Sequence, residues 1–164
     1  MKPTKKKKKK KQPTLTYYKK KLWELFSIFI RVRDCLQTTG CSSWGLCISC
    51  NRRYHYKLLQ AGHFLPGRHG YNLYSEKGTH SQCYNCNVNL RGNTMEYQDA
   101  LIKMYGQETI DELRRVEKIT KQYKIYEIQE MIEEYKKKIK AFGILPPSVK
   151  MELLKEIKIN KEIT

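Results

Sequence analysis

The sequence predicts a small α+β protein in which a cysteine-rich core with short strands lies between helical segments. Three observations favour this class. Apolar residues recur at helical spacing near the N-terminus, a glycine-rich segment at 38–93 carries two Cys-x-x-Cys pairs, and helical spacing returns over 94–142. With 164 residues, the chain can form one modest core or a small domain with an appended bundle.

The first helix is predicted over 17–37, and two arginines follow its apolar stripe. The stripe consists of Leu22, Leu25, Phe26, Phe29 and Ile30. Arg31 and Arg33 are candidate phosphate-binding residues, because a guanidinium matches the geometry of a phosphate. The alternative is a charged helix face that complements the helix dipole.

The segment before this helix, residues 1–16, is expected to be a disordered arm. Its lysine run lies between Pro3 and Pro13, repels itself and has nothing apolar to bury. Such a run binds phosphates, serves as a nuclear import signal, or only keeps the tail solvated. The candidate nucleic-acid contacts in it are Lys5, Lys6, Lys7, Lys8, Lys9, Lys10 and Lys11.

The domain organisation predicted from these patterns is a helix with the core over 17–93, a helical region over 94–147 and a tail over 148–164. In the core we expect turns and two short strands, near 46–48 and 58–64, with a helix from about Cys86 that restarts beyond Gly92. The helical region should contain helices ending at Gly106 and spanning 125–142, and the tail one short helix. The long helix suggests a homodimer as a hypothesis.

Net charge restricts the class of partner. The chain has 33 Lys and Arg residues against 16 Asp and Glu residues, a net charge of +17. This excess indicates nucleic acid or an anionic membrane. The longest apolar stretch, 22–30, contains Glu24 and is too short to cross a bilayer, so we expect no membrane partner. No apolar signal-peptide core follows the basic N-terminus, and an intracellular location is therefore expected.

The two cysteine pairs predict a structural zinc site. Cys47 with Cys50, and Cys83 with Cys86, can each form a knuckle, and two knuckles supply the four thiolates of a closed tetrahedral Zn²⁺ site. Buried unligated thiols are the alternative, and disulfides are disfavoured without a secretory signal. Cys35 and Cys41 lie outside the pattern and are expected to be free.

Other residues in the core have the chemistry of phosphodiester hydrolysis. That reaction needs a base for water, a cation for the leaving oxygen and a clamp for the phosphate. His63, Asn87 and Arg68 supply these types. The alternatives are a structural histidine and a helix N-cap asparagine. His80 could orient His63, help to hold a metal, or satisfy a turn.

The strings 60–64 (QAGHF), 80–87 (HSQCYNCN) and 92–93 (GN) resemble the lambdoid phage NinG/Rap recombination-endonuclease family. The flanks at 26–34 and 105–106 fit as well, and the resemblance covers about 22–142. It implies a relation to the HNH or ββα-metal nucleases, in which two strands and a helix surround a divalent metal beside a structural zinc. Such a zinc-stapled ββα core would be flanked by an N-terminal helix and a C-terminal helical hairpin.

The resemblance also implies roles. His63 matches the general base at the end of the first strand, and Asn87 matches the ligand of a catalytic Mg²⁺ or Mn²⁺ ion. The implied substrate is branched DNA, such as Holliday-like junctions, in the cytoplasm of a phage-infected host. In this sequence Gly62 replaces the aspartate or histidine that many HNH proteins carry before the base. Gly78 replaces the central asparagine, which leaves His63 without its usual orienting partner.

Two other function classes remain open from the sequence. A non-catalytic zinc-knuckle protein could bind nucleic acid with the same basic surface, and an RNA-binding or structural interaction protein would share the composition. The order of four cysteines, a histidine and an asparagine favours the structure-selective DNA endonuclease over both.

Overall fold

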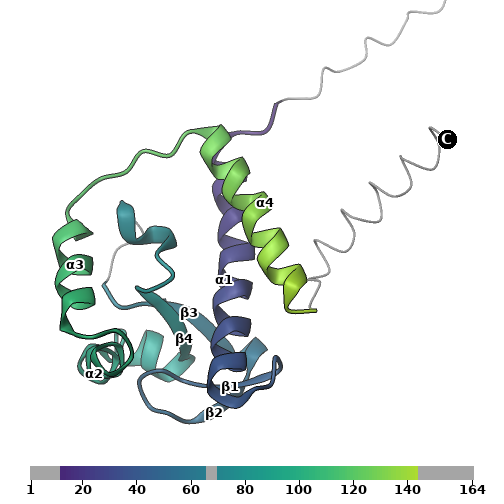
Figure 1. Cartoon of the computed structure of the whole chain (residues 1–164). Helices are drawn as coiled ribbons and strands as arrows, with labels where there is room; N and C mark the ends of the chain where they lie inside the picture. The colour runs from purple at the N-terminus through teal and green to yellow at the C-terminus, as the bar shows by residue number, and fades with distance from the viewer. Residues whose placement is uncertain (1–11, 66–69, 144–164) are drawn as a thin grey trace, which may run out of the picture.

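The computed structural model of this protein describes residues 12–65 and 70–143 and confirms a mixed α+β fold (Figure 1). Its α-helices are α1 (Leu15–Thr39), α2 (Thr94–Tyr105), α3 (Gln107–Glu117) and α4 (Ile125–Ala141). Its strands are β1 (Trp44–Leu46), β2 (Arg53–His55), β3 (Leu59–His63) and β4 (Thr79–Cys83). Short turns of other helical types are η1 (Tyr56–Leu58), η2 (Tyr71–Tyr74) and η3 (Asn85–Asn89).

Helix α1 has clear signals at both ends. The Thr14 hydroxyl accepts a 3.4 Å hydrogen bond from the Tyr17 N–H, and Gly40 ends the helix with φ 68°. The helix begins at Leu15, two residues before the predicted start at residue 17. The lysines at 5–11 and the tail at 148–164 lie outside the described residues.

The strands form two antiparallel hairpins, where the sequence predicted only two strands. β1 pairs with β2, and β3 pairs with β4 with His63 opposite Thr79 and Gly62 opposite His80. Every residue of β4 is buried. Helix α1 contacts one side of the β3–β4 hairpin, while Tyr97 of α2 donates a 2.9 Å hydrogen bond to the Gly62 carbonyl. Four of the five residues of β4 are polar, so this buried strand lacks the apolar–polar alternation that reveals a half-buried strand.

The segment after β4 is less regular than predicted. The helix expected from Cys86 is only the π-helical turn η3. Arg91, Gly92 and Asn93 then take positive φ angles of 49°, 96° and 42°, which stop helical continuation. Helix α2 restarts at Thr94 and ends before Gly106, as the sequence predicted.

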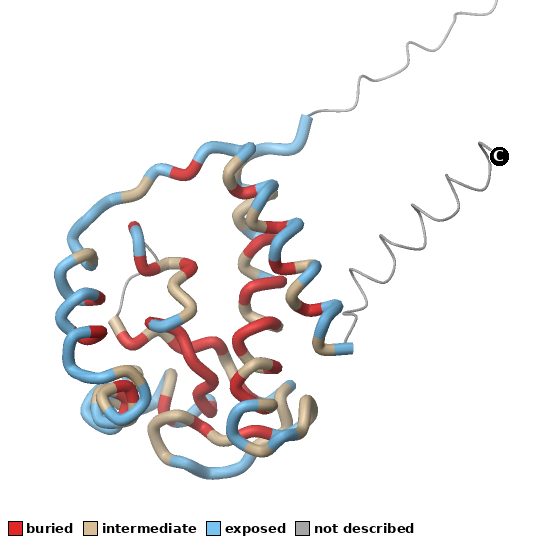
Figure 2. The backbone as a smooth tube through the Cα atoms, in the orientation of Figure 1, coloured by how far each residue is buried: buried red, intermediate tan, exposed pale blue. Residues whose placement is uncertain are grey.

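Helix α4 packs along α1, while α2 and α3 contact each other (Figure 1). The ring of Phe26 lies 5.3 Å from Tyr135 and the ring of Phe29 lies 5.6 Å from Phe142, so the two helices run in parallel. Figure 2 shows their facing sides buried. The buried residues of α4 are Ile128, Ile132, Tyr135 and Ile139. Helix α1 covers this stripe, and the homodimer suggested from the long helix stays a prediction.

Candidate functional site

The four predicted zinc cysteines come together in the fold. Their Sγ atoms all lie within 4.8 Å of one another, and the sulfurs of Cys50 and Cys83 are 3.9 Å apart. Zinc–sulfur bonds of about 2.3 Å in a tetrahedron place sulfurs about 3.8 Å apart. The cluster can therefore hold a metal ion such as zinc. Cys35 and Cys41 are free and outside it, as predicted.

Backbone geometry builds the two knuckles. The first follows β1, where the Asn51 N–H bonds to the Cys47 carbonyl and Asn51 itself adopts a left-handed φ of 54°. The second joins the end of β4 to η3, and the Cys86 N–H donates to Cys83 Sγ at 3.5 Å. The Ile48 N–H bonds to the Ser81 carbonyl at 2.9 Å and joins the first knuckle to β4. A metal here would link two segments that are separated by 32 residues in the sequence.

Hydrogen bonds to sulfur prepare the cluster for a cation. Burial raises the pKa of Cys83, but donation from the Cys86 N–H and the Tyr54 hydroxyl outweighs it and brings this pKa to about 7. Asn93 Nδ2 also donates to Cys86 Sγ at 3.8 Å. Burial raises the pKa of Cys47 and Cys86, so the four sulfurs need a bound cation to become thiolates together, which is the form that binds zinc.

His63 lies at the end of β3 between α1 and η2. Its ring stacks on Trp23 at 5.4 Å with an interplanar angle of 15°. Its Nε2 lies 3.0 Å from the Leu73 carbonyl oxygen. Because a carbonyl only accepts, this hydrogen bond requires the proton on Nε2 and makes Nδ1 the acceptor of the neutral ring.

The Leu73 carbonyl therefore orients His63, and the expectation that Gly78 leaves it without a partner is corrected. The buried amide of Asn72 fixes this turn by donating a 3.0 Å hydrogen bond to the Leu113 carbonyl. Sequence reasoning missed Asn72, because its partner lies 41 positions away. An asparagine inside the apolar string Tyr71–Tyr74 was the only available signal.

The side chain of Asn87 lies close to Gly62, the residue directly before His63. It lies in η3, one position after Cys86, so the second knuckle positions it. Its Nδ2 donates a 2.7 Å hydrogen bond to Gln60 Oε1. Its Oδ1 lies 3.1 Å from where a β carbon on Gly62 would be. Asn87 thus lies beside β3 at Gln60 and Gly62, while the His63 ring packs against Trp23 and Leu73.

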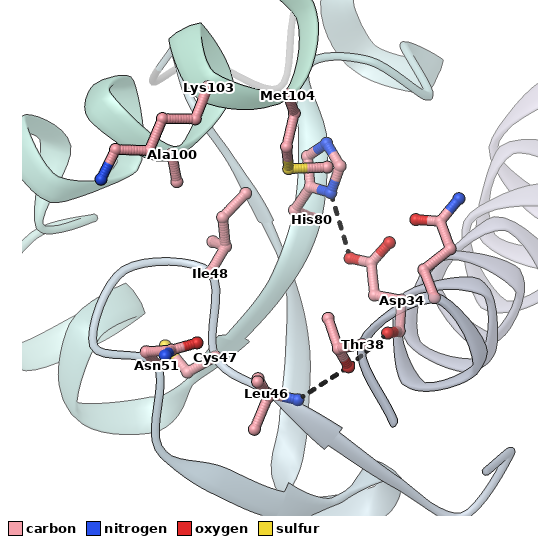
Figure 3. A pocket seen from close by; sticks show the side chains of 11 residues that line it. Asp34, Thr38, Leu46, Cys47, Ile48, Asn51, His80, Ala100, Lys103 and Met104 are labelled. Carbon is pink, nitrogen blue, oxygen red and sulfur yellow. Dashed lines mark hydrogen bonds and ion pairs between the residues drawn. The ribbon is translucent and has the colours of Figure 1, made fainter. Parts of the chain in front are cut away.

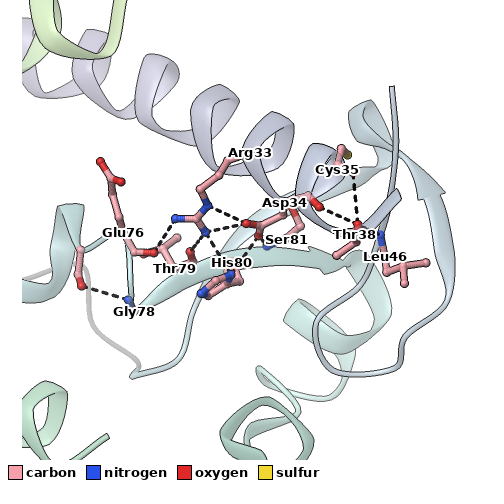
Figure 4. Close-up of polar contacts among 12 residues, drawn as sticks. Arg33, Asp34, Cys35, Thr38, Leu46, Glu76, Gly78, Thr79, His80 and Ser81 are labelled. Carbon is pink, nitrogen blue, oxygen red and sulfur yellow. Dashed lines mark hydrogen bonds and ion pairs between the residues drawn. The ribbon is translucent and has the colours of Figure 1, made fainter. Parts of the chain in front are cut away.

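His80 belongs to a different network and does not orient His63 (Figure 4). It is 1% exposed, with Nδ1 3.2 Å from Asp34 Oδ2 and Nε2 3.4 Å from the Tyr105 hydroxyl. Arg33 donates to Asp34, to the Glu76 carbonyl at 2.7 Å and to the Thr79 carbonyl at 2.9 Å. These contacts place His80 and Arg33 in a network within the fold, and their predicted roles in catalysis and phosphate binding stay predictions.

The Asp34 carboxylate is the centre of this network. Burial raises its pKa, but the hydrogen bond and charge of His80, the charge of Arg33 and the Ser81 N–H outweigh burial and lower the pKa below its usual value. Asp34 and His80 also line a pocket of about 360 Å³ with Ile48, Ala100 and Met104 (Figure 3). His63 and Asn87 are not part of its lining, so this pocket is separate from the candidate nuclease residues.

The remaining predicted phosphate ligands are placed as follows. Arg31 donates to the Ser27 carbonyl at 3.0 Å and to the Tyr56 carbonyl at 3.3 Å, and its guanidinium lies 5.8 Å from the Tyr56 ring centre. Desolvation by burial lowers the pKa of Arg31. Its role in the fold is thus structural. Arg68 lies outside the described residues. Within residues 12–65 and 70–143, no helix is long and apolar enough to cross a membrane.

Comparison with known proteins places the chain in a family. A family model described as "Bacteriophage Lambda NinG protein" matches residues 1–143. The protein named ninG of Escherichia phage lambda is 31% identical over 99 residues, which cover 60% of this chain and 44% of that protein. The ninG proteins of Escherichia phage 933W and Enterobacteria phage H19B are equally identical, with 45% of each covered.

The aligned region thus spans a little under half of these curated relatives. No solved structure matches the chain. The family model covers most of the chain, including both cysteine pairs, His63 and Asn87. The chain therefore belongs to the bacteriophage lambda NinG protein family.

Proposed function

We propose that this protein is a metal-dependent endonuclease that cuts branched DNA formed during recombination. One observation carries the proposal: the second cysteine knuckle brings the Asn87 oxygen to Gly62, one residue before His63, whose imidazole is oriented by the Leu73 carbonyl. A nuclease of this class needs a base and a cation ligand close together, and both are supplied here by short, well-anchored segments.

In this proposal each residue has a distinct task. His63 accepts the proton of the attacking water at Nδ1, because Nε2 is committed to the Leu73 carbonyl. Asn87 would hold Mg²⁺ or Mn²⁺, which stabilises the leaving oxygen of the phosphodiester when bound. The cysteine site acts structurally, since Cys86 precedes Asn87 and any movement of the knuckle would move the ligand.

The substrate class is supported by charge and by family resemblance. The net charge of +17 favours a polyanion, and contacts to phosphate make binding depend steeply on salt. Because Arg31 and Arg33 bond to backbone carbonyls, phosphate contact shifts to exposed basic residues such as Arg52, Lys57 and Arg91. The resemblance to recombination endonucleases points to branched over linear DNA.

His63→Ala is expected to reduce nicking of a labelled four-way DNA junction by about 10²–10⁴-fold, the usual contribution of a general base. Wild type and variant are compared with magnesium, manganese or EDTA, beside a matched linear duplex. His55→Ala is the control, because His55 lies on β2, where it caps the turn η1 and packs its ring on Trp44. Junction binding is measured in parallel and should persist in His63→Ala.

Two results would contradict the proposal. Equal cutting by wild type and folded His63→Ala would remove His63 as the base. Tight junction binding without cutting in any metal would favour the rival class, a non-catalytic zinc-knuckle protein that binds nucleic acid.

A further inference from the structure

Two side-chain oxygens converge on Gly62, one from Asn87 and one from Gln82. A β carbon on Gly62 would overlap Gln82 Oε1 and would lie 3.1 Å from Asn87 Oδ1. The Gln82 oxygen therefore occupies the space that a side chain would take at this position, with the Asn87 oxygen next to it. Glycine permits this packing, one residue before His63.

The orientation of the Gln82 amide follows from its donors. Its Nε2 donates to Ser49 Oγ at 2.8 Å and to the Gly92 carbonyl at 2.7 Å. A carbonyl cannot donate, so the amide cannot be reversed without losing the bond to Gly92. Oε1 is consequently held toward Gly62.

Gln82 Oε1 is a buried acceptor without a hydrogen-bond partner among the described residues. Gln82 is itself 0% exposed. Buried polar atoms are nearly always paired, and an exception calls for an explanation such as an ion. Asn87 faces the same space with its oxygen, because its Nδ2 is committed to Gln60.

We propose that Gln82 is a second protein ligand of the divalent cation, and that its Oε1 and Asn87 Oδ1 form a two-oxygen half-site at Gly62. This inference rests on the proposed function for its cation. Mg²⁺ and Mn²⁺ are hard ions that accept amide carbonyl oxygens as ligands. Gln82 would thus supply the ligand that is missing because this chain has Gly62 where many HNH proteins carry an aspartate or histidine.

The charge of this half-site has a consequence for binding. Both ligands are neutral amides, so a DNA phosphate must supply the negative charge. Cation and DNA should therefore each strengthen the binding of the other. Ser49 of the first knuckle also holds Gln82, so the cysteine site positions both ligands.

The first test measures Mn²⁺ affinity by electron paramagnetic resonance with the full-length protein bound to a four-way junction. Gln82→Glu replaces a neutral oxygen with a charged one and, although it removes the donor to the Gly92 carbonyl, should tighten Mn²⁺ binding about tenfold in the folded protein. Gln60→Glu is the matched control, because it adds the same charge nearby and keeps the acceptor for Asn87 Nδ2. Its effect should be clearly smaller, and an equal effect would overturn the assignment.

The second test needs no variant at Gln82. Wild-type protein with ¹³C at the glutamine side-chain carbonyl should show a ¹³C hyperfine coupling to bound Mn²⁺, and this coupling should persist in labelled Gln60→Glu. Bound Mn²⁺ without this coupling, or no Mn²⁺ binding at all, would overturn the inference. The coupling in a protein that cuts no DNA would support the Gln82 assignment and refute only the nuclease.

Discussion

Cys83→Ser, or removal of the metal by a chelator, is expected to unfold the region from β1 to η3. Structural zinc contributes about 10–16 kcal/mol to the folding of small zinc domains. The apolar cluster around the cysteines is small, with Cys35 and Leu59 as its other fully buried members. Because net domain stability is only about 5–15 kcal/mol, this loss exceeds what the cluster can replace.

Zinc content and thermal unfolding followed by circular dichroism would check this result. Cys41→Ser is the matched control, since Cys41 lies outside the four-sulfur cluster and should leave zinc content and melting unchanged. Hydrogen exchange should show protection lost in β3 and β4 but retained between α1 and α4, whose core is separate. A chelated protein with unchanged melting and exchange would show that the metal does not hold this fold.

Asp34→Ala is expected to destabilise the protein by about 3–5 kcal/mol, as when one partner of a buried ion pair is removed. Asp34 is 4% exposed, pairs with Arg33 at 2.7 Å and accepts a 2.6 Å hydrogen bond from the Ser81 N–H. Its loss would leave the Arg33 charge buried without its counterion. Denaturant unfolding measures the effect, with exposed Asp99→Ala as the control, for which a small change is expected.

The stability difference between wild type and Asp34→Ala should also depend on pH, and the direction follows from the pKa of Asp34. The pKa of Asp34 is lowered in the folded protein, so its contribution is complete above the unfolded value of about 3.9 and is lost as pH falls through the folded pKa. The stability difference between wild type and Asp34→Ala should therefore be constant near neutrality and shrink in acid. A difference that does not shrink in acid would contradict the ionised network.

Much of the fold was predictable because its signals are local. The apolar stripe of α1, the end of α2 at Gly106 and the grouping of the four cysteines follow from periodicity, a glycine and spacing. Strand β4 was not predictable, because four of its five residues, Thr79 to Gln82, are polar and give neither an alternation nor an apolar run. The apolar face of α4 was visible in the sequence, but periodicity does not say which surface covers it.

The candidate site divides in the same way. Residue types and order by themselves determined that cysteine knuckles bracket His63 and that Asn87 follows the second knuckle. Only the tertiary structure decided that Leu73 orients His63, that Arg33 and His80 serve Asp34, and that Gln82 turns its oxygen to Gly62. The physical reason is that a buried polar group must find a partner through packing, and that partner can lie 40 or more positions away in sequence.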